Sequence, residues 1–210
     1  MVDCFAVVLA YHLILSAYGF WLPIDQGGSW SAFVRAYELA RFGPATKTNT
    51  RRSVAGRRFD ATQRVAMRAA LARRPVVFDG RQARAIAIGF ADYVGRSMVP
   101  VHACAIMPDH VHLVVGRFRL SIERTCEQLK GAATAQLNRD GIHPFADVHY
   151  CNGRTPTPWA RKGWWVFLNS NSDIHRSIRY VDKNPVHAGL RPQRWSFVTP
   201  YEEGTLRVTR

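Results

Sequence analysis

The most constraining feature of this sequence is a short stretch, Asp109 to Val115, in which polar and apolar residues alternate. Alternate residues of a β-strand share a face, so His110 and His112 are expected to project side by side. The apolar residues between and after them then point the other way, into a core. Two imidazoles on one strand face can hold one divalent metal ion, although two histidines near a turn are often only polar strand residues.

A second informative stretch, Tyr180 to Pro185, has the composition of a helix end. Tyr180 and Asn184 stand four residues apart, which places them on one face of a helix. A pair of metal-binding imidazoles, an amide oxygen and a phenol together suggest chemistry on a phosphodiester. Two simpler interpretations stay open here: Tyr180 as a core aromatic residue, and Asn184 as the cap of a helix that Pro185 ends.

The charge of the chain narrows the class of its partners. Its 210 residues carry 29 Lys and Arg against 15 Asp and Glu, a net charge of +14. Such an excess predicts a polyanionic partner, most simply nucleic acid, with an anionic membrane surface as the weaker alternative. The sequence has no basic amphipathic helix with a clean apolar face, so we expect no membrane partner.

Size and cysteine usage favour one domain in a reducing compartment. With 47% hydrophobic residues the chain can bury one good-sized core, and we expect a single domain over residues 1–210. The cysteines form no Cys-x-x-Cys pair; they are Cys4, Cys104, Cys126 and Cys151. We therefore expect free thiols, a cytoplasmic location and no zinc site.

The apolar run from Phe5 to Pro23 predicts a strand. It lacks the basic start of a signal peptide, and His12 in its middle argues against a membrane span. We interpret residues 11–18 as a central strand covered on both faces.

The order of the predicted elements gives the fold class. Strands are expected at 11–18, 101–107, 110–117, 145–150 and 164–168, and helices at 29–42, 60–74, 81–98, 121–138 and from Asp173 after a Ser172 cap. This order predicts an α+β fold with helices on one face of an antiparallel sheet, and with the strands 101–107 and 110–117 at its centre.

A basic segment lies inside an inserted region at about 29–99. Residues 41–59 contain no acidic residue and little that could be buried, so we expect a mobile basic loop. Its candidate DNA-backbone contacts are Arg51, Arg52, Arg57 and Arg58. A merely solvated loop is an equal alternative, in which case the DNA path could follow Arg154, Arg161 and Lys162.

Two longer stretches closely resemble the single-tyrosine HUH transposases, both the insertion-sequence type and the REP-associated type. They are residues 104–115 and residues 178–190, with Leu129 and Lys130 on the helix between them. The resemblance spans about residues 100–192, together with a plausible first strand at 11–19, and implies a ferredoxin-like HUH endonuclease fold. It also implies a homodimer that acts on single-stranded DNA beside a hairpin.

Residue by residue, the resemblance implies that His110 and His112 hold a divalent metal, Mg²⁺ or Mn²⁺, with Asn184 as the third ligand. Tyr180 matches the nucleophile, which would form a 5′-phosphotyrosine and leave a free 3′-OH. Lys130 would contact the phosphate or be a solvated lysine. Residues 163–169 depart from the REP-associated pattern, which leaves the recognised hairpin and target open.

Two other functions fit parts of the sequence. A histidine-triad nucleotide hydrolase also carries His-x-His on a strand, but it would need a further histidine where Val114 stands. A domesticated DNA-binding protein of the same fold, which no longer transposes, is the more serious alternative. The intact set of candidate site residues argues for retained strand cleavage.

Overall fold

The computed structural model describes residues 7–22, 24, 34, 37–46 and 60–204. The chain divides into two compact units, residues 1–16 with 77–210, and residues 17–76. The boundary differs from the insertion predicted at about 29–99, because residues 77–99 belong to the first unit. These residues include a long helix that connects two strands of the sheet.

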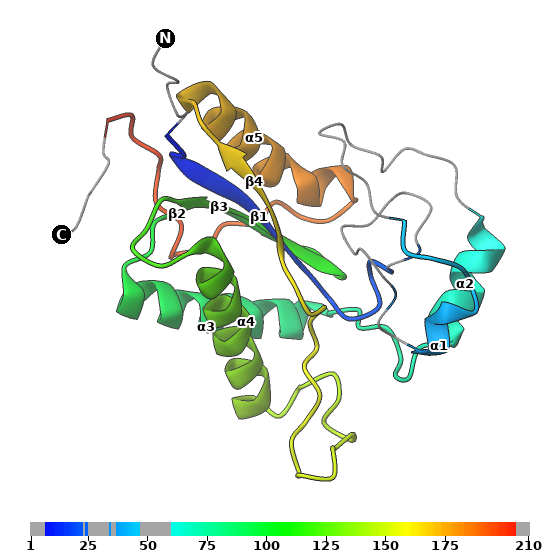
Figure 1. Ribbon diagram of the computed structural model, residues 1–210. Coiled ribbons are helices and arrows are strands. Elements are labelled where there is room, and N and C mark those ends of the chain that lie inside the picture. The colour runs from blue at the N-terminus through cyan, green and yellow to red at the C-terminus, as the bar shows by residue number, and fades with distance from the viewer. Residues whose placement is uncertain (1–6, 23, 25–33, 35–36, 47–59, 205–210) are drawn as a thin grey trace. The chain divides into compact units, whose positions relative to one another are not determined.

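The larger unit is a four-stranded antiparallel sheet with helices (Figure 1). Its elements are β1 (Ala10–Ser16), α3 (Gly80–Ser97), β2 (Val101–Ile106), β3 (His110–Gly116), α4 (Ile122–Arg139), β4 (Trp164–Leu168) and α5 (Asn171–His187). The strand order is β2-β3-β1-β4, and every neighbouring pair is antiparallel. This is a ferredoxin-like sheet, and the predicted α+β class is confirmed.

Strand β1 lies inside the sheet, between β3 and β4, as predicted. Both of its faces are covered: Leu13 and Leu15 are fully buried on one face, and Ala10 on the other. The prediction that both 101–107 and 110–117 are central is only half right. Strand β3 is central, but β2 forms an edge of the sheet.

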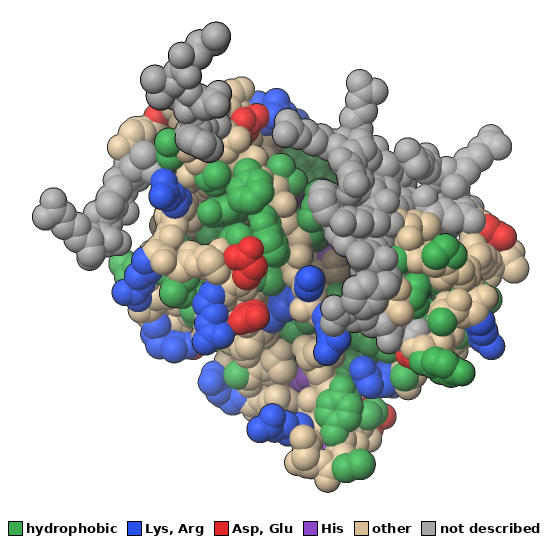
Figure 2. Space-filling view, in the orientation of Figure 1, with side chains coloured by type: hydrophobic (Ala, Val, Ile, Leu, Met, Phe, Trp, Pro, Cys, Tyr) green, Lys and Arg blue, Asp and Glu red, His purple; other side chains and the backbone are tan. Residues whose placement is uncertain are grey.

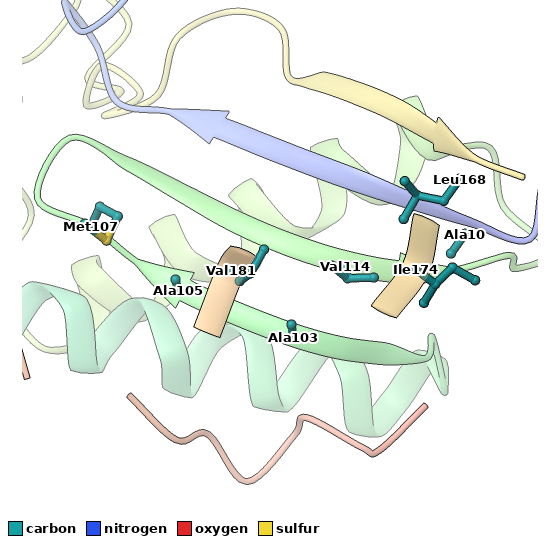
Figure 3. Packing of buried hydrophobic residues seen from close by; sticks show 8 residues of the cluster. All are labelled: Ala10, Ala103, Ala105, Met107, Val114, Leu168, Ile174 and Val181. Carbon is teal, nitrogen blue, oxygen red and sulfur yellow. The ribbon is translucent and has the colours of Figure 1, made fainter. Parts of the chain in front are cut away.

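Helices cover both faces of the sheet. Helices α3 and α4 lie on one face, as predicted, and α5 adds a layer on the opposite face (Figure 1). In Figure 3, Ile174 and Val181 of α5 lie over Val114 and over small residues of the strands. These small residues are Ala10, Ala103 and Ala105. Because alanine side chains are short, they allow the helix backbone to approach the sheet closely.

The β2–β3 hairpin turns at Pro108 and Asp109, as predicted. The amide of Met107 donates a hydrogen bond of 2.8 Å to the carbonyl of His110 and closes the turn. Helix α4 is capped by Ser121, whose hydroxyl accepts from the amide of Arg124 at 3.3 Å. His110 is therefore the first residue of β3, at the end of a tight turn.

Two details of α5 differ from the prediction. Its N-cap is Ser170 rather than Ser172, because the Ser170 hydroxyl accepts from the amide of Asp173. Pro185 lies inside the helix and does not end it. The helix ends at His187 with Ala188 as its C-cap; Gly189 (φ +73°) follows, and the amide of Leu190 donates back to the carbonyl of Pro185 at 2.8 Å. Asn184 therefore stays within the helix.

The strand predicted at 145–150 is wrong, since this segment folds as turns. The amide of Ala146 donates to the carbonyl of His143, and the amide of Val148 donates to the carbonyl of Phe145. Phe145 is buried and anchors the segment. One buried aromatic side chain therefore holds this segment outside the sheet.

The smaller unit, residues 17–76, contains α1 (Tyr37–Ala40) and α2 (Ala61–Ala69). Asp60 caps α2 through hydrogen bonds from the amides of Thr62 and Gln63, as its position before the helix predicts. A small core holds the unit together; it consists of Leu22, Ile24, Leu39 and Met67. Of the helix predicted at 29–42, residues 37–40 form α1, and residues 29–33 and 35–36 lie outside the described residues.

Candidate active site

The two histidines of β3 lie on the face of the sheet that α5 covers. His112 pairs with Ile14 of β1 and with Ala105 of β2, and Ala105 belongs to the core beneath α5. The two rings are nearly perpendicular, with centroids 4.6 Å apart. Their Nε2 atoms lie 3.0 Å from each other. The predicted side-by-side projection of the two imidazoles is thus what the strand produces.

Each of these rings has a further partner on its other nitrogen. The Nδ1 atom of His110 lies 2.7 Å from a carboxylate oxygen of Asp109. The Nδ1 atom of His112 lies 3.0 Å from Nε2 of His12, a residue of β1. The four side chains form a continuous chain, in the order Asp109, His110, His112, His12. The Nε2 atoms of His110 and His112 face each other at the middle of this row of four side chains.

Burial keeps the inner part of this chain uncharged near neutral pH. It lowers the pKa of His12 to about 4. Burial, followed by the neighbouring His110 and His12, lowers the pKa of His112 to about 2. Both rings are therefore neutral at pH 7, and a neutral imidazole carries one N–H and one lone pair. Neutral imidazole is also the form that binds metals.

Tyr180 of α5 lies against the same cluster. Its ring centroid is 5.5 Å from that of His112, edge to face, and 5.7 Å from that of His12. The next residue, Val181, is fully buried and fixes this turn of the helix on the sheet. Tyr180 itself is 52% exposed, so a solvent-borne reactant can reach it. The alternative of Tyr180 as a core aromatic is therefore wrong.

Asn184 lies one helical turn beyond Tyr180 on α5 and is partly buried. In the described part of the chain, no group of three or more His, Cys, Asp or Glu side chains is arranged to hold a metal ion. A metal on the two histidines would therefore need a ligand of another type. The amide oxygen of Asn184 is such a donor, and it remains the predicted third ligand.

The geometry of the histidine pair fits a divalent metal. Metal–nitrogen bonds of about 2.1 Å that meet at a right angle would separate the two nitrogens by about 3.0 Å. The observed Nε2–Nε2 distance is 3.0 Å. Both opposite nitrogens already face a partner, Asp109 or His12, which is the usual environment of metal-binding histidines.

The predicted DNA-binding residues have different outcomes. Arg154, Arg161 and Lys162 are exposed, while Arg51, Arg52, Arg57 and Arg58 lie outside the described residues.

The Nζ atom of Lys130 donates to the carbonyls of Ala160 at 2.7 Å and Lys162 at 3.2 Å. Burial lowers the pKa of Lys130. Lys130 is therefore an anchor of the loop before β4, and the alternative of a merely solvated lysine is wrong.

Sequence reasoning missed His12 as a member of the site. It used this histidine only as an argument against a membrane span. The available signal was a lone polar residue inside a strand whose neighbours are all apolar or aromatic, since a buried polar group needs a hydrogen-bonding partner. The identity of the partner could not be found without the β1–β3 register, because His12 and His112 are 100 residues apart.

The chain is similar in structure to a solved protein of known class. No protein-family model and no curated protein matches the chain. A solved structure of a REP-associated tyrosine transposase bound to a REP hairpin is similar at a TM-score of 0.44 and 10% identity. The match covers 88% of this chain and 70% of that one. No helix among the described residues is long and apolar enough to span a membrane.

Proposed function

We propose that this protein cleaves and rejoins single-stranded DNA through a 5′-phosphotyrosine at Tyr180, as a transposase-like enzyme. The observation that carries the proposal is the position of Tyr180. An accessible phenol stands edge to face against the buried, neutral ring of His112, whose Nε2 atom faces that of His110 at 3.0 Å. A nucleophile beside a potential cation site is the arrangement that phosphodiester transfer needs.

The chain's own residues would hold a divalent cation at the Nε2 atoms of His110 and His112 and at the amide oxygen of Asn184. Imidazole ligands suit Mn²⁺, whereas Mg²⁺ prefers oxygen, so Mn²⁺ is the more suitable probe. When bound, such a cation supplies Lewis-acid polarisation of the scissile phosphate.

Tyr180 would perform the covalent step. Its phenol oxygen forms a bond to phosphorus as the bond from phosphorus to the 3′ oxygen breaks, and the departing 3′ oxygen becomes a hydroxyl. The phenolic proton leaves Tyr180 and a proton joins the 3′ oxygen, so the step needs neither water nor a nucleotide cofactor. A 3′-hydroxyl can reverse the step and join new ends, because the phosphodiester energy is kept in the tyrosyl ester.

The charge of the chain favours DNA as the partner. The net charge is +14, and Lys and Arg side chains are spread over the face shown in Figure 2. Such a surface attracts a phosphate backbone. A hairpin beside the cleaved strand, and action as a homodimer, follow from the sequence resemblance and are part of the proposal.

The test is a covalent adduct on a denaturing gel. The protein is incubated with Mn²⁺ and single-stranded oligonucleotides that copy the DNA flanking its coding region. We expect a denaturation-resistant protein–DNA band that Tyr180→Phe abolishes, whereas Tyr150→Phe, at an exposed tyrosine of the loop before β4, keeps it. An adduct formed by Tyr180→Phe would refute the assignment. No adduct from the wild type would leave the DNA-binding alternative.

The metal is tested separately. His110→Ala and His112→Ala should each abolish cleavage and weaken Mn²⁺ binding in calorimetry, with a much smaller effect on affinity for single-stranded DNA. Unchanged Mn²⁺ binding in both variants would refute the metal site.

A further inference from the structure

We propose that His12 is a positioning residue of the site: it accepts a hydrogen bond from Nδ1–H of His112 and so directs the Nε2 lone pair of His112 toward His110. This inference rests on the proposed function, because it assigns His12 a role in preparing the metal site. His12 lies on β1, about 100 residues before His112 in the sequence, and neither of the two motif stretches contains it.

The contact between His110 and Asp109 fixes which ring nitrogen of His110 carries the proton. Its Nδ1 atom faces the carboxylate of Asp109 at 2.7 Å. An ionised carboxylate can only accept hydrogen bonds, so the proton of this contact belongs to Nδ1 of His110. The Nε2 atom of a neutral His110 then presents its lone pair to the space between the two rings.

Both ring nitrogens of His112 face another histidine. Nε2 lies 3.0 Å from Nε2 of His110, and Nδ1 lies 3.0 Å from Nε2 of His12. If the one proton of His112 sat on Nε2, this atom would face His110 as a donor and could not bind a metal. With the proton on Nδ1 and His12 as acceptor, both facing Nε2 atoms offer lone pairs to one cation. His12 is thus for His112 what Asp109 is for His110.

The pairing of β1 with β3 holds the His12 ring against the His112 ring. His12 and His112 belong to adjacent strands, where His12 pairs with Val114 and His112 pairs with Ile14. The two histidines are diagonal neighbours on one face of an antiparallel pair, which is within reach of ring side chains. Their centroids lie 5.1 Å apart. The His12 ring also borders Tyr180, so the same residue contacts a metal-site histidine and the nucleophile.

A merely structural histidine would make a different prediction. If His12 only fills space in the core, any side chain of similar size should leave metal binding unchanged. If it acts as an acceptor, loss of the acceptor should weaken metal binding even where the fold is kept. Loss of such a partner behind a metal-binding histidine typically costs 10–100-fold in metal affinity.

The experiment compares Mn²⁺ affinity by calorimetry in wild type and three variants, with no DNA present. His12→Phe keeps a ring but removes the acceptor, and we expect a 10–100-fold weaker Kd. His12→Gln places an amide oxygen near the position of the lost Nε2, and we expect recovery to within a few-fold of wild type. The matched control is His102→Phe, at a partly buried histidine of β2 that bonds the carbonyl of Thr199, and it should bind as wild type does.

Each outcome decides one claim. Folded His12→Phe with wild-type Mn²⁺ affinity would overturn the positioning role, as would an equal loss in folded His12→Phe and His12→Gln. If His112→Ala also keeps wild-type affinity, the metal site of the proposed function is what fails. If His12→Phe does not fold, nitrogen-15 spectra of the wild-type imidazoles decide the question. We expect the His112 proton on Nδ1, and a proton on Nε2 with His12 as donor would overturn the inference.

Discussion

At Gly89 the helix α3 packs directly against the backbone of α4, and replacing this glycine with alanine should destabilise the protein. A Cβ atom at position 89 would lie 2.6 Å from the carbonyl oxygen of Ala132, 2.8 Å from its carbonyl carbon and 2.9 Å from Cα of Ala133. These are backbone atoms of α4, so the clash cannot be relieved by a side-chain rotation. Carbon atoms in favourable contact lie about 3.5–4.0 Å apart, so one helix has to move by several tenths of an ångström or more.

The expected magnitude comes from two opposing effects. Overpacking of this kind costs about 1–3 kcal/mol, while alanine is favoured over glycine inside a helix by about 1 kcal/mol. Gly89→Ala should therefore lower the free energy of unfolding by up to about 2 kcal/mol. Gly131→Ala is the matched control, because Gly131 is an exposed glycine of α4 where an added Cβ would meet no atom within 4 Å. It should raise the free energy of unfolding by up to about 1 kcal/mol.

The assay is urea unfolding followed by circular dichroism, with thermal unfolding as a second measurement. The two variants should differ by about 1–3 kcal/mol, which corresponds to roughly 2–12 °C in Tm for a chain of this size. Equal stabilities for Gly89→Ala and Gly131→Ala would refute the close approach of α3 and α4. A Gly89→Ala variant more stable than wild type would do the same.

Two further predictions concern basic residues. Lys130→Met removes the donor to two carbonyls and should lower the free energy of unfolding by about 1–3 kcal/mol. The control Lys183→Met, at an exposed site of α5, should lower it by less than about 0.5 kcal/mol. Equal losses in urea unfolding would show that Lys130 does not anchor the loop. For the basic segment, alanine at all four arginines should flatten the plot of log K against log salt by up to about three units on a single strand, without changing the preferred sequence. The four are Arg51, Arg52, Arg57 and Arg58. Identical slopes in a salt titration would show that these arginines do not contact phosphates.

Much of the sheet could be predicted because its signals are local. The alternation from His110 to Val115 defines a strand and its two faces without any tertiary information. Pro108 and Asp109 mark the turn before it, and Ser121 marks the start of α4. Each of these features depends on residues within one turn or one strand, so neighbouring residues in the sequence are enough to predict it.

The errors occurred where several local signals compete. Ser170 and Ser172 are both suitable N-caps, and only the tertiary position of the chain decides that α5 starts after Ser170. Pro185 lacks an N–H and therefore favours a helix end, yet α5 continues past it to His187, and the chain leaves the helix only at Ala188 and Gly189. The segment from Phe145 has strand-forming residues, yet it is anchored by burial of one aromatic side chain.

The site depends on a feature that no single motif contains, the packing of α5 on a sheet face made of small residues. Ala105 pairs with His112 across β2 and β3, and its short side chain allows Val181 to reach the sheet. Because Val181 is buried there, the neighbouring Tyr180 is held at the edge of the contact, exposed to solvent but against the His112 ring. The alanines, the buried valine and the exposed tyrosine are therefore parts of one arrangement. Packing of α5 on this sheet face thus places Tyr180 beside the histidine pair.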